Sequence, residues 1–187
     1  LIPSSFGLFL FYLSINSFFI YPRSQRYLLK EYYSTMSPDE TDLQILKLLQ
    51  KDAKMTVKQL SEKLHLTPTP IFERIKKLEK HGFISSYQAI LDRQLLGLTM
   101  LVFCNVTLQE HQAERLTQFE SDVQKLPEVL ACYHIGGQDD YLLKVCVKNM
   151  GAYHLFVSKT LASLKNIGKV HSSFVMSEVK AHGGLPI

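Results

Sequence analysis

The chain has 187 residues, which is enough for one large domain or two small ones, and its 46% hydrophobic content is ordinary for a globular protein. The net charge of +4 arises within the first 90 residues, because residues 91–187 carry nine basic and nine acidic side chains. A surface that binds a polyanion is therefore expected in the first half and not in the second. The three cysteines, Cys104, Cys132 and Cys146, have no CxxC spacing and lie in apolar runs, which indicates buried, reduced thiols.

Residues 1–36 are a hydrophobic leader, which we expect to be disordered or not part of the native protein. Its apolar, aromatic run is about 16 residues long, shorter than the roughly 20 that span a bilayer. No basic region precedes this run and no small-residue cleavage site follows it, so it does not fit a signal peptide. Two interpretations remain: a membrane anchor with Arg23, Arg26 and Lys30 on the cytoplasmic side, or translated upstream sequence before a true start at Met36. We favour the second, and expect no membrane partner and a cytoplasmic protein.

Residues 37–84 predict three short helices. In the first, Ser37 is the expected cap and Glu40 its capping-box partner, before an apolar stripe that ends at Leu49. A second capping box, Thr56 to Gln59, opens the next helix. The third starts at Thr67-Pro68-Thr69-Pro70, runs to about His81 and closes at Gly82. Two helices joined by so tight a turn indicate a helix-turn-helix.

The third helix has an apolar face and a cationic face. Ile71, Ile75 and Leu78 follow helical spacing and must pack inward. The opposite side and its flank carry Thr69, Glu73, Lys76 and Lys80, with Arg74 and Lys77. A solvated surface with local ion pairs would look similar. The hydroxyls and free N–H groups at the helix start favour contact with double-stranded DNA.

The rest of the chain alternates strands and helices. Residues 83–91 are strand-like. A strand linker is expected over residues 85–98, which overlaps this stretch. Residues 99–187 then predict the following elements in order: strand 100–108, helix 112–126, strands 129–135 and 141–147 around the turn Gly136-Gly137-Gln138-Asp139, helix 153–164 and strand 170–179. This order matches a ferredoxin-like βαββαβ domain, so the chain is of the α+β class with an N-terminal winged-type helix-turn-helix domain. One sheet face needs cover, so a second subunit is expected.

Residues 37–187 resemble the leucine-responsive regulator/AsnC (Lrp/AsnC) family. The resemblance is carried by residues 42–52, by Leu66-Thr67-Pro68-Thr69-Pro70 with residues 73–79 and 82–84, by residues 136–144, and by residues 175–180. It implies a transcription regulator that senses an amino acid between paired C-terminal domains. It also implies homodimers that assemble into octamers or similar rings. No catalytic residue, metal or cofactor is expected.

The same resemblance places two groups of functional residues. Contacts to bases or phosphates are expected from Thr67, Thr69, Arg74 and Lys77, with Lys76 and Lys80 neutralising the DNA backbone. The effector site is expected around His134, Gly136, Gly137, Asp140, Met150 and Ser173. The two glycines would let backbone N–H groups approach a carboxylate, and Asp140 could accept from an α-ammonium group. On the residues alone, without the resemblance, a tight turn between strands is the favoured interpretation.

Three positions depart from the family pattern. His65 stands where the helix-turn-helix turn usually has glycine, and it must tolerate a positive φ. His134 and Ser173 replace an aliphatic and an aromatic residue, which makes the pocket more polar. These changes favour an effector other than leucine, such as a polar or aromatic amino acid. An alternative function is an enzyme of the sirohaem-decarboxylase type, which shares this architecture and would use His134 and His154.

Overall fold

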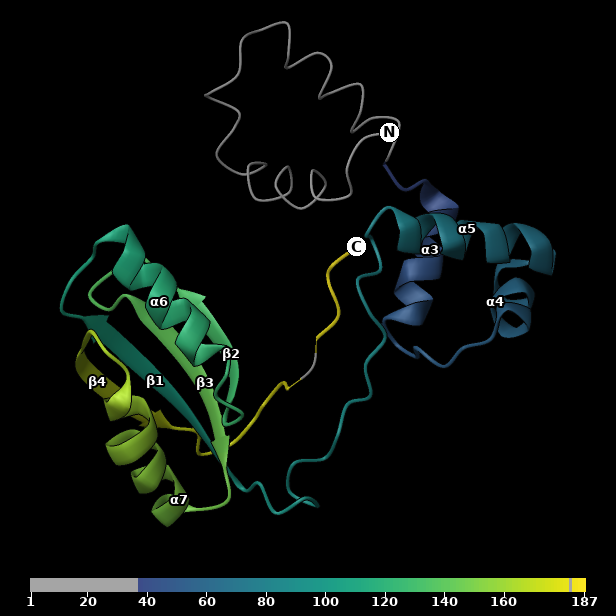
Figure 1. Ribbon diagram of the computed structural model, residues 1–187. Helices are drawn as coiled ribbons and strands as arrows, with labels where there is room; N and C mark the ends of the chain where they lie inside the picture. The colour runs from purple at the N-terminus through teal and green to yellow at the C-terminus, as the bar shows by residue number, and fades with distance from the viewer. Residues whose placement is uncertain (1–36, 182) are drawn as a thin grey trace, which may run out of the picture. The chain divides into compact units, whose positions relative to one another are not determined.

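The computed structural model describes residues 37–181 and 183–187, which form two compact units (Figure 1). The first, called the N-terminal unit, comprises the described residues up to 88 together with residues 184–187. The second, called the sheet unit, comprises residues 89–183 apart from residue 182. The hydrophobic leader and both of its interpretations lie outside the described residues. Among the described helices, none is long and apolar enough to cross a membrane.

The N-terminal unit contains the three expected helices. They are α3 (Glu40–Leu49), α4 (Val57–Leu64) and α5 (Pro68–Lys80). Each contributes a fully buried side chain to a common core: Ile45, Leu60 and Ile71 have no exposed surface. Gly82 has a φ of 78° and closes α5, and the N–H of the next residue donates to the Leu78 carbonyl at 2.9 Å.

The cap of α3 differs from the prediction that Ser37 would cap it. Asp39 is the cap residue, and its carboxylate accepts from the Asp42 N–H at 2.9 Å. The Asp42 carboxylate accepts in return from the Asp39 N–H at 3.2 Å, which completes a capping box. The physical reason is that the two aspartates have the required spacing, and their charges also suit the positive end of the helix. The capping box of Thr56 and Gln59 on α4 forms as predicted.

The turn between α4 and α5 passes through His65 in the left-handed conformation, with φ 54° and ψ 38°. This confirms the positive φ expected there from the sequence. A β-carbon in this region crowds the following carbonyl oxygen, which costs about 1–2 kcal/mol relative to glycine. His65 therefore strains the turn between α4 and α5.

Replacing His65 with glycine is expected to stabilise the N-terminal unit. Relief of the strain is partly offset by the greater freedom of glycine in the unfolded chain, so the net gain is about 0.5–1 kcal/mol. Thermal unfolding followed by circular dichroism should show a midpoint raised by a few degrees. His65→Ala keeps the strained backbone and serves as the control, with no rise expected. A lower midpoint for His65→Gly would show that the histidine ring stabilises the turn.

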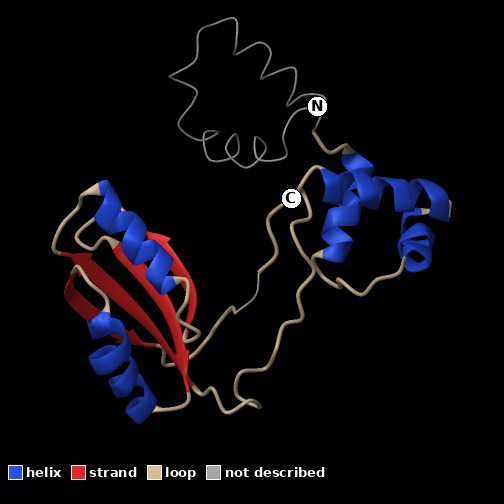
Figure 2. Ribbon diagram, viewed as in Figure 1, coloured by secondary structure: helices blue, strands red, loops and turns tan. Residues whose placement is uncertain are grey.

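The sheet unit is a four-stranded antiparallel sheet with two helices (Figure 2). The spatial order of the strands is β2-β3-β1-β4. The elements in chain order are β1 (Met100–Leu108), α6 (Ala113–Val123), β2 (Val129–His134), β3 (Tyr141–Val147), α7 (Met150–Leu155) and β4 (Ile167–Phe174). After α7 the chain continues as a π-helical turn (Phe156–Thr160) and a short 3-10 helix (Leu161–Ser163). This is the predicted βαββαβ order.

Several predicted boundaries are wrong, among them the end of the helix predicted over residues 112–126, which is α6 and stops at Val123. Residues 85–98 contain no strand, because this stretch pairs with no other strand of the described chain. The last helix begins at Met150 and not at residue 153, because Asn149 caps it by accepting from the Ala152 N–H at 2.9 Å. The last strand runs from Ile167 to Phe174 and not from residue 170 to 179, because its pairing with β1 begins at Ile167 and the chain leaves the sheet after Phe174.

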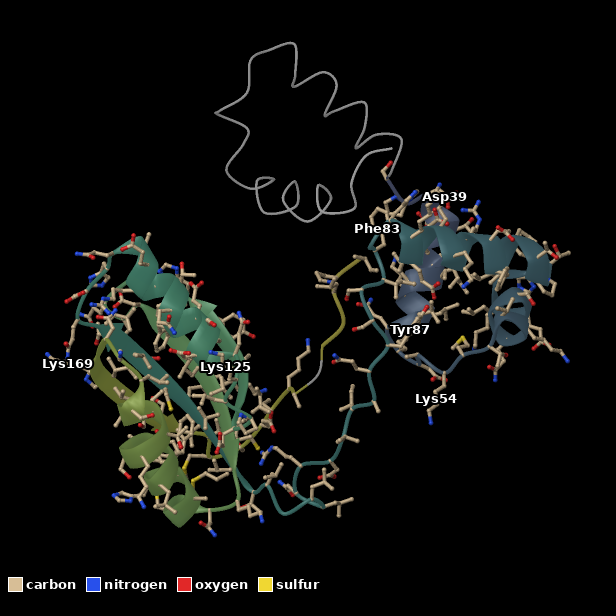
Figure 3. The ribbon with its side chains drawn as sticks, in the orientation of Figure 1. Asp39, Lys54, Phe83, Tyr87, Lys125 and Lys169 are labelled. Atoms are coloured by element: carbon tan, nitrogen blue, oxygen red, sulfur yellow. The ribbon has the colours of Figure 1, made fainter. Side chains whose placement is uncertain are left out.

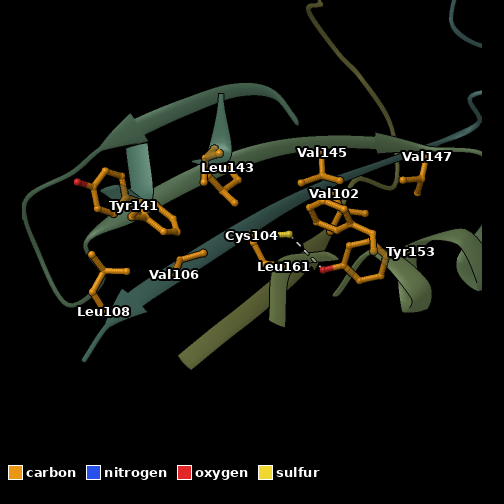
Figure 4. Close-up of a cluster of buried hydrophobic side chains, with 13 residues drawn as sticks. Val102, Cys104, Val106, Leu108, Tyr141, Leu143, Val145, Val147, Tyr153 and Leu161 are labelled. Atoms are coloured by element: carbon orange, nitrogen blue, oxygen red, sulfur yellow. Dashed lines mark hydrogen bonds between the residues drawn. The ribbon is translucent and has the colours of Figure 1, made fainter. Parts of the chain in front are cut away.

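The core of the sheet unit lies between the sheet and its helices (Figure 4). Alternate residues of the two central strands point into it, among them Val102 and Val106 on β1 and Leu143 and Val145 on β3. Cys104 belongs to this core, and its sulfur lies 3.1 Å from the Tyr153 hydroxyl. Burial raises the pKa of all three thiols, to about 11 for Cys132, which keeps them protonated and unreactive.

The end of the chain packs against α3 in the N-terminal unit. The Gln50 side chain accepts from the Leu185 N–H at 2.6 Å and donates to the Leu185 carbonyl oxygen at 3.2 Å. One amide thus satisfies both backbone groups of Leu185, as a neighbouring strand would. No local sequence pattern indicates this contact, because the residues lie 135 positions apart.

Candidate functional site

The first candidate site is the exposed face of α5. Thr67 caps this helix by position, but its side chain makes no cap hydrogen bond, which leaves its hydroxyl and the Thr69 N–H available, since Pro68 and Pro70 have no N–H. Thr69, Lys76, Lys77 and Lys80 are all exposed. Five of the six residues predicted to contact DNA thus share an exposed, cationic face that begins at a helix N-terminus. Such a face suits phosphates and base edges.

Arg74, the sixth residue, points elsewhere. Its Nη1 atom lies 2.6 Å from a carboxylate oxygen of Asp39 and 2.6 Å from one of Asp42. The Asp42 side chain is only 3% exposed, whereas Arg74 is 31% exposed. Figure 3 labels Asp39 at the start of α3, where this cluster lies. Arg74 therefore ties α5 to the cap of α3 and is not grouped with the exposed lysines.

The second candidate site is the turn between β2 and β3. Gly137 has a φ of 150°, a conformation that favours glycine. A β-carbon at Gly136 or at Gly137 would meet no other atom within 4 Å, so the backbone there faces open space. Within the described residues, the N–H groups of both glycines donate to no other group. The turn therefore offers two free donors to an anion.

Asp140 closes this turn and already has two partners. One carboxylate oxygen accepts from the Leu108 N–H at 2.7 Å, and the other lies 2.9 Å from His111 Nε2. The hydrogen bond from Leu108, and then that from His111, hold the pKa of the Asp140 carboxyl below its usual value. Asp140 fixes the turn to the end of β1, whether or not it also receives a ligand's ammonium group.

Replacing Asp140 with asparagine should destabilise the sheet unit by about 1–2 kcal/mol at pH 7, because a charge-assisted acceptor is lost. The folded-state pKa lies below the unfolded value, so the carboxylate stabilises the fold above its usual pKa and loses that effect as the pH falls through the folded value. Urea unfolding at pH 7 and pH 3 should show a difference between wild type and variant that shrinks in acid. Asp139→Asn is the control, since the Asp139 carboxylate lies 3.7 Å from His171 Nδ1, a long ion pair. A difference that stays constant with pH would contradict this role.

His134 ends β2 beside this turn. Its ring stacks on Tyr141, with centroids 4.7 Å apart and an angle of 18° between the planes. The two residues are paired across the strands, and their row continues through Val106 on β1 to Val170 on β4. His134 thus lies at the same end of the sheet as Gly136 and Gly137.

Met150 and Ser173 lie away from that end. Met150 follows β3, whose 7 residues span about 20 Å, and it is 52% exposed. Ser173 pairs with Phe103, three residues along the strands from the row of His134, and belongs to the strand at the other edge of the sheet. A single chain therefore does not bring together the six predicted effector-site residues.

One feature of the sheet unit escaped the sequence analysis. Glu178, in the segment after β4, lies 3.0 Å from Arg93 and 3.9 Å from Lys144 on β3. Arg93 also donates to the carbonyl oxygens of Leu98 and Thr99. These contacts attach the linker to the sheet and to the C-terminal segment. No local sequence pattern could indicate this ion pair, because Arg93 and Glu178 lie 85 residues apart.

Comparison with known proteins identifies the family. A model of the Lrp/AsnC ligand binding domain matches residues 101–185, and a winged helix-turn-helix DNA-binding model matches residues 38–85. The leucine-responsive regulatory protein of Klebsiella pneumoniae is 40% identical over 149 residues, which are 80% of this chain and 91% of that protein. The chain belongs to the Lrp/AsnC family of transcription regulators. It therefore combines a DNA-binding helix-turn-helix with a ligand-binding domain.

Solved structures of Lrp/AsnC proteins have the same fold. A transcriptional regulator from Neisseria meningitidis, solved as a complex with L-Met, has a TM-score of 0.77 and 35% identity, covering 80% of this chain and 97% of its own. An AsnC family regulator from Agrobacterium tumefaciens has a TM-score of 0.76 and 35% identity, covering 79% and 96%. The predicted α+β fold and family membership are thereby confirmed.

Proposed function

We propose that this Lrp/AsnC chain is a sequence-specific DNA-binding regulator whose affinity for DNA changes when an amino acid binds between its C-terminal domains. The observation that carries the DNA-binding part is the exposed face of α5, with Lys76, Lys77 and Lys80 and an unoccupied helix N-terminus. Thr67 and Thr69 contact bases or phosphates from that end. Arg74 acts in this proposal through the fold of the unit, by holding α3 and α5 together.

The effector is proposed to be an amino acid held by parts of two chains. The free N–H groups of Gly136 and Gly137 suit its carboxylate, with Asp140 and His134 beside them. Met150 and Ser173 lie too far along the sheet to join these groups within one chain, so they would come from a second copy. The expected assembly is a homodimer that builds an octamer or a similar ring, acting in the cytoplasm.

The residues proposed for the pocket bear on which amino acid binds. The Neisseria meningitidis neighbour was solved with L-Met, and the Klebsiella pneumoniae relative is named for leucine. His134 and Ser173 make the pocket of this chain more polar than an aliphatic side chain needs. We therefore propose a polar or aromatic amino acid in preference to leucine. The regulators among the relatives also favour this function over a decarboxylase that would use His134 and His154.

A thermal-shift panel of the twenty amino acids tests the effector. The proposal expects at least one amino acid other than leucine to raise the unfolding midpoint of the sheet unit, because a ligand that binds only the folded state stabilises it. Gly137→Ala, which strains the turn, should abolish the shift, whereas Ala162→Gly on the exposed 3-10 helix should not. If leucine alone raises the midpoint, the proposed effector class is wrong. If no amino acid does, the amino-acid sensing itself is wrong.

A further inference from the structure

One carboxylate, Glu73, lies on the exposed cationic face of α5. Helical spacing places it opposite the buried residues Ile71 and Leu78, one turn after Thr69. Lys76 and Lys77 follow at the third and fourth positions, where a glutamate usually forms ion pairs. Within the described part of the chain, however, Glu73 forms neither an ion pair nor a side-chain hydrogen bond.

Lys76 is engaged by other groups. Its Nζ atom lies 3.8 Å from a carboxylate oxygen of Glu79 and 5.6 Å from the ring centroid of Phe72. Glu79 also accepts a hydrogen bond of 3.0 Å from the Tyr87 hydroxyl, which Figure 3 labels. Glu79, at the side of the helix, is thus engaged in local contacts. Glu73, at the centre of the exposed face, makes no such contact.

A free carboxylate on a face that approaches DNA weakens binding to phosphates by repulsion. It becomes favourable only where it meets a hydrogen-bond donor, since an ionised carboxylate accepts and does not donate. In the major groove the donors are the amino groups of cytosine and adenine. Guanine and thymine present acceptor oxygens there, and the adenine amino group lies beside the N7 acceptor. Cytosine is therefore the base whose edge suits Glu73.

We infer that Glu73 is a specificity-determining residue that selects cytosine at one position of each bound site. This inference rests on the proposed function, in which α5 enters the major groove. Glu73 contributes discrimination between bases and not affinity, because its charge opposes the general attraction of Lys77 and Lys80 for the DNA backbone.

Selection of binding sites from a randomised duplex library by the intact chain tests the inference. Wild type should recover a site with a preferred cytosine. Glu73→Ala should lose the preference at that position alone, and Glu73→Gln should change it to adenine, whose N6 and N7 atoms match an amide. The expected discrimination in wild type is about fivefold or more against each other base, measured on single-base variants of the site.

Glu62→Gln on α4 is the matched control, since it removes one exposed carboxylate from the same unit. It should leave the selected bases unchanged and raise affinity for every duplex alike. The inference is overturned if Glu73→Gln and Glu73→Ala select the same bases as wild type, or if they raise all affinities equally as the control does. If the wild-type protein selects no preferred sequence, the proposed function and the inference are both overturned. Selection with the wild-type protein is sufficient to recognise that outcome.

Discussion

Replacing Arg74 with methionine should unfold the N-terminal unit at temperatures where the sheet unit stays folded. Methionine keeps most of the aliphatic stem but leaves the nearly buried Asp42 carboxylate without its cation. An uncompensated buried charge is strongly destabilising, and allowing for the partial exposure of Arg74 we expect a loss of about 2–3 kcal/mol. In a unit of this size that lowers the midpoint by about 10–20 °C. Hydrogen exchange of the α3 and α5 amides measures the effect directly.

The double variant Arg74→Met with Asp42→Asn is the control for this prediction. Removing both charges should recover part of the lost stability, because the nearly buried carboxylate is gone and the remaining Asp39 carboxylate is exposed to water. The pKa of the Asp39 carboxyl is held below its usual value, first by the Asp42 N–H and then by Arg74. The stabilisation by Asp39 is therefore present above its usual pKa and is lost in acid. An Arg74→Met variant with wild-type protection in α3 and α5 would contradict the structural role of Arg74.

Replacing Lys76, Lys77 and Lys80 with glutamine should abolish most DNA binding while leaving the fold intact. These lysines are exposed, and Lys76 makes only a long ion pair, so stability should change little. Each lysine that contacts a phosphate releases a counterion, so losing three should reduce the slope of log affinity against log salt by about three per bound chain. At low salt the affinity for any duplex should fall at least about tenfold.

The matched control carries glutamine at Lys148, Lys159 and Lys165, which are exposed residues of the sheet unit. It has the same net charge as the α5 variant and should keep the wild-type salt dependence. Fluorescence anisotropy with a labelled duplex at several salt concentrations gives both slopes. Equal loss of affinity in the two triple variants would show that overall charge, and not the face of α5, attracts the DNA.

Arg74 and the lysines of α5 have different expected roles, although helical spacing alone placed them on neighbouring sides of the helix. Periodicity correctly assigned Ile71 and Leu78 to the core and the lysines to the surface. It put Arg74 on the flank of the cationic face, because its partners lie 32 and 35 residues earlier in the chain. We therefore expect loss of DNA binding in an Arg74 variant to accompany unfolding of the N-terminal unit.

The sheet was predictable where residues alternate and less so where a tertiary contact ends an element. Residues 100–108 and 141–147 match β1 and β3, because both central strands bury every second side chain over most of their length. The last strand was predicted too long, since the apolar residues Val175 and Met176 continue the pattern. In the structure the chain leaves the sheet there, and Glu178 pairs with Arg93.

The effector site was the least predictable part from one chain. The sequence suggested six residues by family resemblance, and the structure groups His134, Gly136, Gly137 and Asp140 at one end of the sheet. Met150 and Ser173 are elsewhere, and no local pattern could reveal whether residues so far apart in one chain belong to one site. Asp140 also has a local function, the attachment of the turn to Leu108, which a strand-turn-strand pattern does not indicate.

The most direct test of the account is the equilibrium binding of the intact chain to its selected duplex and to a scrambled duplex. Each is measured with and without the amino acid found by thermal shift. We predict at least about 10³-fold tighter binding to the selected duplex, and at least about a fivefold change in that affinity when the amino acid is bound. Equal affinity for the two duplexes, or an affinity for the selected duplex that the bound amino acid leaves unchanged, would contradict the account.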